Sequence, residues 1–481
     1  MKRITPRGRQ ALWLPLILAL LSSAQVPTST SPATRHLTSW LAAFDGADWN
    51  AYEAFVRENF ATEPEAMFQS LRFRQQTGGF DLKKIEAETP LHVTALIQER
   101  DSDLLARTVV EVEQAEPHRI RTLHTQPIAR PPDMAVPHLD EKELIASLGD
   151  RIQRAVSADK FAGAVLVAKN GNPIFAQAYG LADREHHIPN TLQTRFRIGS
   201  MNKMFTAVAT LQLVELGKLE LDNPVGKYLT DYPNKELASK VTIRQLLNHT
   251  GGTGDFFGPE FEVHRLELRT HEDYIKLFGN RPVRFEPGSR WEYSNYGFLI
   301  LGAVIDKVSS QNYFDYVRDH VYTPAGMGST GSEPEDEPVP DRSIGYTKEG
   351  GTAWHPNTNF MPYRGMSAGG GYTTVGDLLR FANALQENKL LDAHYTALLT
   401  TGRVETPGGG HYGFGFQESI FNGLRCFGHG GGSPGMNGDL KICPEVGYVV
   451  VALANLDPLA AQHISDFVLN RLPYRDRRVE K

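Results

Sequence analysis

The sequence predicts an α+β protein with a small N-terminal domain and a larger C-terminal domain. Residues 36–130 begin with helical patterns and end with strand-like alternation, an order typical of a small α+β domain. Residues 140–475 have strand patterns at both ends, with mostly helix and loop between them. The two regions are separated by a proline-rich stretch at 131–139, which predicts a linker.

Length and composition exclude several classes of protein. The chain has 481 residues, of which 41% are hydrophobic and 22% are charged, so it is an ordinary globular sequence. Its formal net charge of −6 argues against a basic nucleic-acid-binding face, and we expect no nucleic-acid partner. Only two cysteines are present, which excludes a disulfide-rich scaffold and any cluster of four thiolates.

The N-terminal segment predicts a signal peptide at residues 1–24. Four basic side chains precede an apolar run at 11–21, and the small residues Ser22-Ser23-Ala24 follow it. The alternative is an uncut N-terminal anchor. No later stretch reaches the roughly 18 apolar residues of a membrane helix, so we expect an exported, periplasmic or secreted protein with no span after cleavage.

Strand signals mark the two ends of the larger domain. Apolar runs at 163–168 and 174–179 flank Asn170-Gly171, a strong hairpin signal. Residues 448–454 read as another buried strand, and an apolar helical pattern ends the domain. Because export permits disulfides, we expect Cys426 and Cys443 to face each other across neighbouring antiparallel strands.

A serine lies at the head of a helix that should be buried. The helix that follows Ser200 is apolar nearly all round and is followed by Gly217, a good C-terminal residue. Lys203 lies three residues on, so its side chain stands on the same face. Burial and the helix dipole both lower the pKa of such a lysine, toward an amine that can activate Ser200 as a nucleophile.

Two weaker interpretations compete with this pair. Ser200 alone could be an ordinary helix N-cap. The motif Ser-x-x-Lys also occurs at Ser157 and Lys160, in a polar stretch with no buried helix after it. We interpret that second match as a solvated helix end.

A Tyr-x-Asn motif supplies the next candidates. Tyr293 and Asn295 follow a Pro-Gly turn and begin a very apolar helix. A tyrosine beside Lys203 could be held as a phenolate or could relay a proton to the leaving group, and the asparagine amide could donate to a substrate carbonyl. The alternatives are a core tyrosine and a helix N-cap. A second match at Tyr232 lies in a charged loop, where we expect a turn.

The last motif places a histidine among glycines on a strand. His429 is followed by Gly430, Gly431 and Gly432 and then by a loop and the strand 439–443. A strand edge without side chains lets a substrate lie against backbone N–H groups. The alternative is a glycine-rich hairpin that contains one histidine.

These three motifs, in this order, resemble the signature of serine penicillin-recognising enzymes. The sequence is similar to their class-C-type branch, which includes β-lactamases, D-alanyl-D-alanine carboxypeptidases, D-amino-acid amidases and esterases. Segments 246–252 and 369–374 also resemble this family. The resemblance implies an antiparallel sheet built from both chain ends, flanked by helices, with an inserted helical lobe. Residues 36–130 loosely resemble the small NTF2-like modules.

The resemblance also implies the catalytic roles. Ser200 would be the acylated nucleophile, and Lys203 and Tyr293 would share the general base and acid work. The oxyanion hole would be formed by the backbone N–H groups of Ser200 and Gly432. No metal ion and no organic cofactor are implied.

Substrate binding is implied for Asn295, which would orient the substrate, and for the strand residues His429, Gly430 and Gly431. Many members of the family carry Lys-Thr-Gly at this strand, where the lysine attracts a substrate carboxylate. Histidine is mostly neutral at pH 7, so carboxylate capture is weakened here. This favours esters, amides or D-amino-acid peptides as substrates.

Several functional alternatives stay open. The chain could be a non-catalytic or slow penicillin-binding receptor that senses the cell wall, or a β-lactamase, and its oligomeric state is not fixed by the sequence. Gly-x-Ser-x-Gly around Ser433 is typical of α/β-hydrolases, but Pro434 cannot donate the backbone N–H that an oxyanion hole needs there. A glycine pattern at 408–413 lacks the strand–helix context of a nucleotide site.

Overall fold

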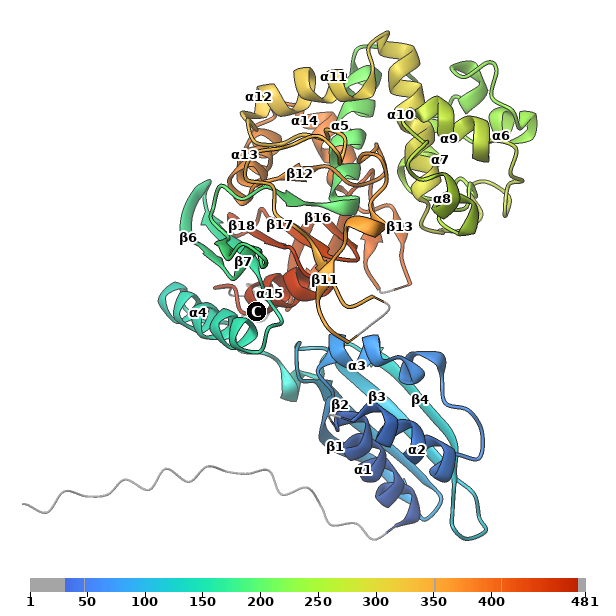
Figure 1. The fold of residues 1–481 in the computed structure, drawn as a ribbon, viewed down its shortest axis with the longest axis vertical. Helices are drawn as coiled ribbons and strands as arrows, with labels where there is room; N and C mark the ends of the chain where they lie inside the picture. Colours follow the sequence, from blue (N-terminus) through green and yellow to red (C-terminus); the bar gives the residue numbers. More distant parts are fainter. Residues whose placement is uncertain (1–30, 47, 350–351, 408, 475–481) are drawn as a thin grey trace, which may run out of the picture. The chain divides into compact units, whose positions relative to one another are not determined.

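A computed structural model describes residues 31–46, 48–349, 352–407 and 409–474 (Figure 1). The predicted signal peptide lies outside these described residues. The described chain divides into two compact units. The first unit runs to Glu99 and includes Leu104–Ile128, and the second consists of Arg100–Asp103 and the chain from Ala129 onward.

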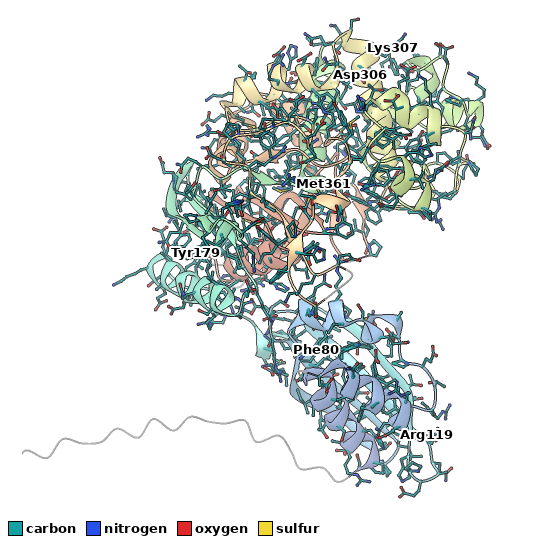
Figure 2. All side chains as sticks on the ribbon, in the orientation of Figure 1. Phe80, Arg119, Tyr179, Asp306, Lys307 and Met361 are labelled. Carbon is teal, nitrogen blue, oxygen red and sulfur yellow. A yellow bond between two sulfur atoms is a disulfide. The ribbon has the colours of Figure 1, made fainter. Side chains whose placement is uncertain are left out.

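The first unit consists of helices followed by a four-stranded antiparallel sheet. The helices are α1 (Pro32–Asp45), α2 (Trp49–Asn59) and α3 (Leu71–Thr77). The strands are β1 (Phe80–Thr89), β2 (His92–Glu99), β3 (Leu105–Val112) and β4 (Ile120–Ile128), and they pair in chain order. An aromatic core that includes Trp40, Phe44, Phe68 and Phe80 lies between helices and sheet; Figure 2 labels Phe80.

The first helix begins earlier than the sequence predicts. The segment before residue 36 reads as a leader rich in Ser, Thr and Pro, but α1 already begins at Pro32. The Ser31 hydroxyl accepts the Thr34 N–H, and proline is well tolerated at the first helical position because it needs no N–H there. Serine and proline therefore start a helix here.

The second unit contains an eight-stranded antiparallel sheet built from both ends of that unit. Early strands β5 (Gly163–Lys169) and β6 (Asn172–Tyr179) join the late strands of the chain through the pairing of β18 with β5. The order is β13-β14-β15-β16-β17-β18-β5-β6. The late strands are β13 (Val404–Glu405), β14 (His411–Tyr412), β15 (Gln417–Phe421), β16 (Leu424–Ser433), β17 (Met436–Cys443) and β18 (Tyr448–Ala454). The predicted fold class is confirmed.

Helices cover both faces of this sheet. Along β18, Val450 packs into a cluster with α4 (Glu141–Ser157) and α15 (Ala460–Leu469), whereas Val451 packs on the opposite side. Because alternate strand residues face opposite ways, β18 is buried along its whole length. The opposite side carries α5 (Asn202–Glu215) and α13 (Val375–Gln386), and the inserted helical lobe beyond them (Figure 1).

The inserted lobe lies in sequence between the short strands β9 (Phe196–Arg197) and β12 (Tyr372–Thr373), which pair with each other. Its helices include α6 (Lys235–Lys240), α7 (Ile243–Leu247), α8 (Pro259–His264), α9 (His271–Phe278), α10 (Asn295–Ser309), α11 (Tyr313–Val317) and α12 (Thr323–Ala325). Helix α10 packs directly against α5. Within the described residues, no helix has the length and apolar character needed to cross a membrane.

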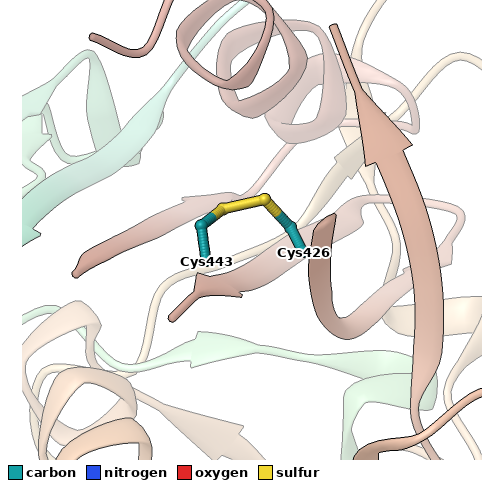
Figure 3. The surroundings of a disulfide bond; sticks show 2 residues. All are labelled: Cys426 and Cys443. Carbon is teal, nitrogen blue, oxygen red and sulfur yellow. A yellow bond between two sulfur atoms is a disulfide. The ribbon is translucent and has the colours of Figure 1, made fainter. Parts of the chain in front are cut away.

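A disulfide links the two central strands β16 and β17. Cys426 and Cys443 are bonded, and their Cα atoms are 4.3 Å apart (Figure 3). Phe427 pairs with Ile442, so the next step of the antiparallel register places the two cysteines opposite each other. The predicted pairing across neighbouring strands is confirmed, and the bond is buried among apolar residues beneath α15.

Removing this disulfide should destabilise the second unit. The double variant Cys426→Ser/Cys443→Ser is expected to lose about 3 kcal/mol in the free energy of unfolding, because the open chain gains the loop-closure entropy of a link across 17 residues. Urea denaturation of the oxidised wild type and the double variant measures this difference. Wild type treated with a reductant is the control and should match the variant; equal stability of all three samples would contradict the prediction.

Candidate active site

Ser200 lies in a tight turn that leads into α5. Gly199 in this turn has φ +51°, a conformation that side chains disfavour. A Cβ atom at Gly199 would also lie 2.9 Å from the backbone nitrogen of Gly432 on β16. The turn at Ser200 therefore approaches the glycine strand closely enough that only glycine fits at position 199, and the Ser200 side chain is left half-buried at a cavity.

Lys203 is fully buried and lies beside Ser200. Its Nζ is 3.1 Å from Ser200 Oγ, donates to Asn295 Oδ1 at 2.7 Å and also donates to the carbonyl oxygen of Ala368. Burial lowers the pKa of Lys203 to about 7, and the carboxylate of Asp255 opposes part of this shift. When the amine is neutral, its two N–H bonds can point at the two carbonyl oxygens, which leaves the lone pair for the Ser200 proton.

Tyr293 lies in the same cavity and is hydrogen-bonded to Ser200. Its ring is partly buried, and the Nζ of Lys203 lies 4.8 Å from the ring centre. Burial raises the pKa of Tyr293 well above its usual range, and the hydrogen bond with Ser200 offsets only part of this rise. The raised pKa favours the neutral phenol over the phenolate.

His249 positions the segment that carries Tyr293. Its carbonyl oxygen accepts the N–H of Glu292, and its Nδ1 accepts the N–H of Ser294, so the residues on both sides of Tyr293 are tied to it. The His249 ring also lies 4.4 Å from the Tyr293 ring. Burial lowers the pKa of His249 far below its usual value, which keeps this ring neutral.

Asn295 is the first residue of α10 but not its cap. Ser294 caps the helix by accepting the N–H of Gly297, which leaves the Asn295 amide for other contacts. Its Nδ2 donates to Asp255 Oδ2 at 2.8 Å and its Oδ1 accepts from Lys203. Nothing in the sequence predicts Asp255 as a site residue, because it lies in a loop outside the three motifs.

His429 lies on β16 within the same cavity but carries no charge. Its Nε2 is 3.0 Å from the Tyr412 hydroxyl, and the ring is 1% exposed. Burial, reinforced by the charge of Lys203, lowers the pKa of His429 to about 3. The His429 side chain is therefore neutral near pH 7 and cannot attract a substrate carboxylate by charge.

The glycines after His429 bring β16 against the turn that contains Ser200. A Cβ at Gly431 would overlap the carbonyl oxygen of Ile198, and one at Gly432 would clash with Pro458. The strand pairs with β17 along this stretch, while its pairing with β15 ends at Gly428. The backbone of 430–432 therefore has no strand neighbour on the side where β15 ends, and this edge lines the cavity with Ser200 and Tyr293.

The cavity has a volume of about 360 Å³ and is mostly polar. Beside the residues already described, it is lined by the polar side chains Gln417, Ser419, Asp439, Lys441, Gln462 and Asp466. The Nζ of Lys441 lies 2.6 Å from Asp439 Oδ1 in a buried ion pair. No group of three or more His, Cys, Asp or Glu side chains able to hold a metal ion occurs in the part of the chain that the structure describes.

The competing motif matches lie elsewhere. Ser157 is exposed at the end of α4, and Lys160 pairs with Asp101. Ser433 ends β16 in a hairpin with β17, which is not the strand–helix turn of an α/β-hydrolase. Tyr232 lies in a loop, in a turn closed by its N–H to the carbonyl oxygen of Leu229, as expected. Its ring is nevertheless 2% exposed and its hydroxyl lies 2.9 Å from that of Tyr296, because the ring packs into the helical lobe although its neighbours are charged.

Comparison with known proteins places this geometry in a family. The protein-family model named Beta-lactamase matches residues 148–473. The chain belongs to the Beta-lactamase family. The match covers nearly all of the second unit, including every candidate site residue described above.

Relatives of this Beta-lactamase family chain differ in their named activities. It is 32% identical over 323 residues to esterase EstB of Burkholderia gladioli, covering 59% of this chain and 82% of EstB. It resembles a penicillin binding protein from Bacillus halodurans (TM-score 0.60, 33% identity, 65% of this chain and 98% of that one). It also resembles a D-stereospecific amidohydrolase from Streptomyces (TM-score 0.57, 27% identity, 68% and 98%).

The chain does not span the whole of its curated relatives. The aligned regions cover 62% and 66% of two Bacillus subtilis proteins that it matches. The second of these is penicillin-binding protein 4*.

The geometry predicts how modification of Ser200 depends on pH. A protonated Lys203 cannot accept the Ser200 proton, so the rate of labelling by a fluorophosphonate should rise with pH to a plateau, with a midpoint near 7. In Asp255→Asn the midpoint should move to lower pH, because the carboxylate that favours the ammonium is gone. Labelling rates measured between pH 5 and about 11.5 test both expectations, because this range also includes the pKa of an ordinary lysine.

The matched control is His429→Gln. The pKa of His429, about 3, lies outside the range of this titration, so the midpoint should stay in place even if the rate changes. A midpoint near 10, or one that Asp255→Asn leaves unmoved, would contradict the assignment of Lys203 as the base.

Proposed function

We propose that this chain is a serine hydrolase that cleaves ester, amide or D-amino-acid peptide bonds through an acyl-enzyme at Ser200. The observation that carries the proposal is the buried Lys203 amine, 3.1 Å from Ser200 Oγ and with a pKa of about 7. A neutral amine at this distance is the base that a serine hydroxyl needs to become a nucleophile. The relatives named as an esterase and an amidohydrolase support this class of reaction.

Acylation follows from the hydrogen bonds around the hydroxyl. Ser200 Oγ attacks the substrate carbonyl carbon while its proton passes to the amine of Lys203. Tyr293 is a neutral phenol that is hydrogen-bonded to Ser200. It can donate its proton to the leaving alcohol or amine, which departs as the C–O or C–N bond breaks. The phenol regains its proton from the Lys203 ammonium, so the base is neutral again at the end of the step.

Charge that develops on the substrate oxygen needs donors. The backbone N–H groups of Ser200 and Gly432 are the proposed oxyanion hole, and their segments approach each other at Gly199. Water then attacks the acyl group of the ester, gives its proton to the same base and releases a carboxylic acid. As the bond between the acyl carbon and Ser200 Oγ breaks, the base returns its proton to this oxygen, which restores the free enzyme.

The cavity favours polar acyl donors. Its wall of amide, hydroxyl and ionic side chains offers hydrogen bonds and little apolar surface for a long alkyl chain. His429 is neutral and offers no cation for a substrate carboxylate, and the Lys441 ammonium in the cavity wall is already paired with Asp439. We therefore propose short esters and amides or D-amino-acid peptides as substrates, with Asn295, Gly430 and Gly431 as substrate-binding residues beside His429.

The domain organisation and location are part of the same proposal. Residues 36–130 would be an NTF2-like domain, 131–139 a linker and 140–475 the hydrolase domain, with export directed by residues 1–24. The disulfide between Cys426 and Cys443 supports export, because such bonds persist in oxidising compartments.

Covalent labelling tests the proposed nucleophile. A fluorophosphonate should label wild type, and Ser200→Ala should abolish this label because the attacking oxygen is absent. Mass spectrometry of the peptide that contains residue 200 identifies the modified side chain. Ser157→Ala is the matched control, since it removes the other Ser-x-x-Lys serine and should label like wild type.

A substrate panel then separates the hydrolase from its alternatives. Nitrophenyl acetate and D-alanine nitroanilide should be hydrolysed by wild type and not by Ser200→Ala, whereas nitrophenyl palmitate and a chromogenic cephalosporin should be poor substrates. Binding of a fluorescent penicillin without turnover of any substrate would indicate a receptor instead. Cephalosporin as the best substrate would indicate a β-lactamase and would contradict the role drawn from the neutral His429.

A further inference from the structure

A second set of serine, histidine and aspartate lies in the helical lobe. His271, the first residue of α9, has its Nδ1 2.6 Å from Asp306 Oδ2 and its Nε2 2.9 Å from Ser367 Oγ. Asp306 is on α10, where Figure 2 labels it, and Ser367 lies in the loop before β12. The Ser367 hydroxyl also lies 2.8 Å from the carbonyl oxygen of Phe298.

This set cannot act as a second nucleophilic centre. Ser367 has no exposed surface and His271 is 3% exposed. A Cβ at Gly302 on α10 would lie 2.3 Å from Ser367 Oγ, so the helix backbone packs directly on the hydroxyl. A substrate carbonyl has no access to this oxygen, and the contacts of the triad must serve another purpose.

The segment that carries Ser367 holds the amine of the active site. Three consecutive carbonyl oxygens, those of Met366, Ser367 and Ala368, accept hydrogen bonds from α5 side chains. The donors are Asn202 Nδ2 at 2.6 Å, Thr206 Oγ1 at 2.7 Å and Lys203 Nζ. The position of this short segment therefore sets the position of one of the two carbonyl acceptors of Lys203.

We propose that His271 is a positioning residue, which with Asp306 and Ser367 tethers the segment Met366–Ala368 to the helical lobe and so keeps the Ala368 carbonyl within reach of Lys203. This inference rests on the proposed function of Ser200 and Lys203. The tether joins three elements, because Asp306 fixes the imidazole from α10, the imidazole fixes the Ser367 side chain, and Ser367 belongs to the loop.

The carbonyl matters because it helps to aim the lone pair of the amine. A neutral Lys203 with only Asn295 as acceptor could rotate about its Cε–Nζ bond and turn its lone pair away from Ser200. The charged and titratable groups that face Lys203 are Asp255, Tyr293, His249 and His429, and the tether touches none of them. Its loss should therefore act on geometry and on the ammonium, and not on the surrounding charges.

Paired substitutions at His271 isolate the contact with Ser367. In His271→Gln the side-chain amide can reach the position of Nε2 and keep a hydrogen bond to Ser367, whereas in His271→Asn it reaches only the position of Nδ1 and Asp306. Ser367→Ala removes the other partner. Tyr232→Phe is the control, because it removes a similarly buried hydrogen bond to α10, the one to Tyr296, without touching the segment.

We expect Ser367→Ala and His271→Asn to lower kcat for nitrophenyl acetate by about tenfold with KM nearly unchanged, an effect the size of one lost buried hydrogen bond. The midpoint of the pH profile should move to lower pH, because the Lys203 ammonium loses an acceptor. His271→Gln and Tyr232→Phe should keep the wild-type midpoint. The tether would be overturned if all four variants had the kcat and the midpoint of wild type. It would also be overturned if Tyr232→Phe lost as much kcat as Ser367→Ala and His271→Asn.

Crystal structures of wild type and Ser367→Ala decide the inference without any activity. The Ala368 carbonyl should remain hydrogen-bonded to Lys203 Nζ in wild type and lie beyond hydrogen-bond distance in the variant. An unmoved carbonyl would overturn the tether even if Ser200 proves to be the nucleophile. Failure of wild type to acylate would refute the proposed function, and the structures would still show whether the tether exists.

Discussion

One interaction organises the second unit: the burial of the Lys203 amine beside the Ser200 hydroxyl. An ammonium with no exposed surface is poorly solvated. Burial therefore lowers the pKa of Lys203 to about 7, so the amine gives up its proton near neutral pH. The helix α5 makes this possible because it is buried almost all round, while its N-terminal turn reaches the cavity. A lysine on an exposed helix face would keep its charge and could not serve as a base.

Local rules account for the parts of the molecule that the sequence predicts. Ser200 and Lys203 share a helix face because their spacing fixes it, and the Asn170-Gly171 turn fixes the hairpin of β5 and β6. The disulfide follows from cysteines on two strands joined by a short hairpin. Periodicity alone does not predict the order of the eight-stranded sheet, because the pairing of β18 with β5 joins segments far apart in the chain.

The rest of the site depends on contacts that leave no local signal. Asp255 lies in a loop whose course is set by the packing of the helical lobe, and Ala368 contributes only a backbone carbonyl, which any residue possesses. Tyr232 lies in the turn that its charged neighbours predict, yet its ring is buried. Charge in the flanking sequence describes the exposed side of a segment and says little about the side that packs inward.

The most direct test of this account is the titration of Lys203 itself. In protein labelled with ¹³C at the lysine Cε position, the resonance that disappears in Lys203→Met belongs to this side chain. The account predicts that this resonance titrates with a midpoint near 7 in the free protein. A midpoint near 10, the value of a solvated lysine, would show that the amine is charged at neutral pH and would contradict its role as the base.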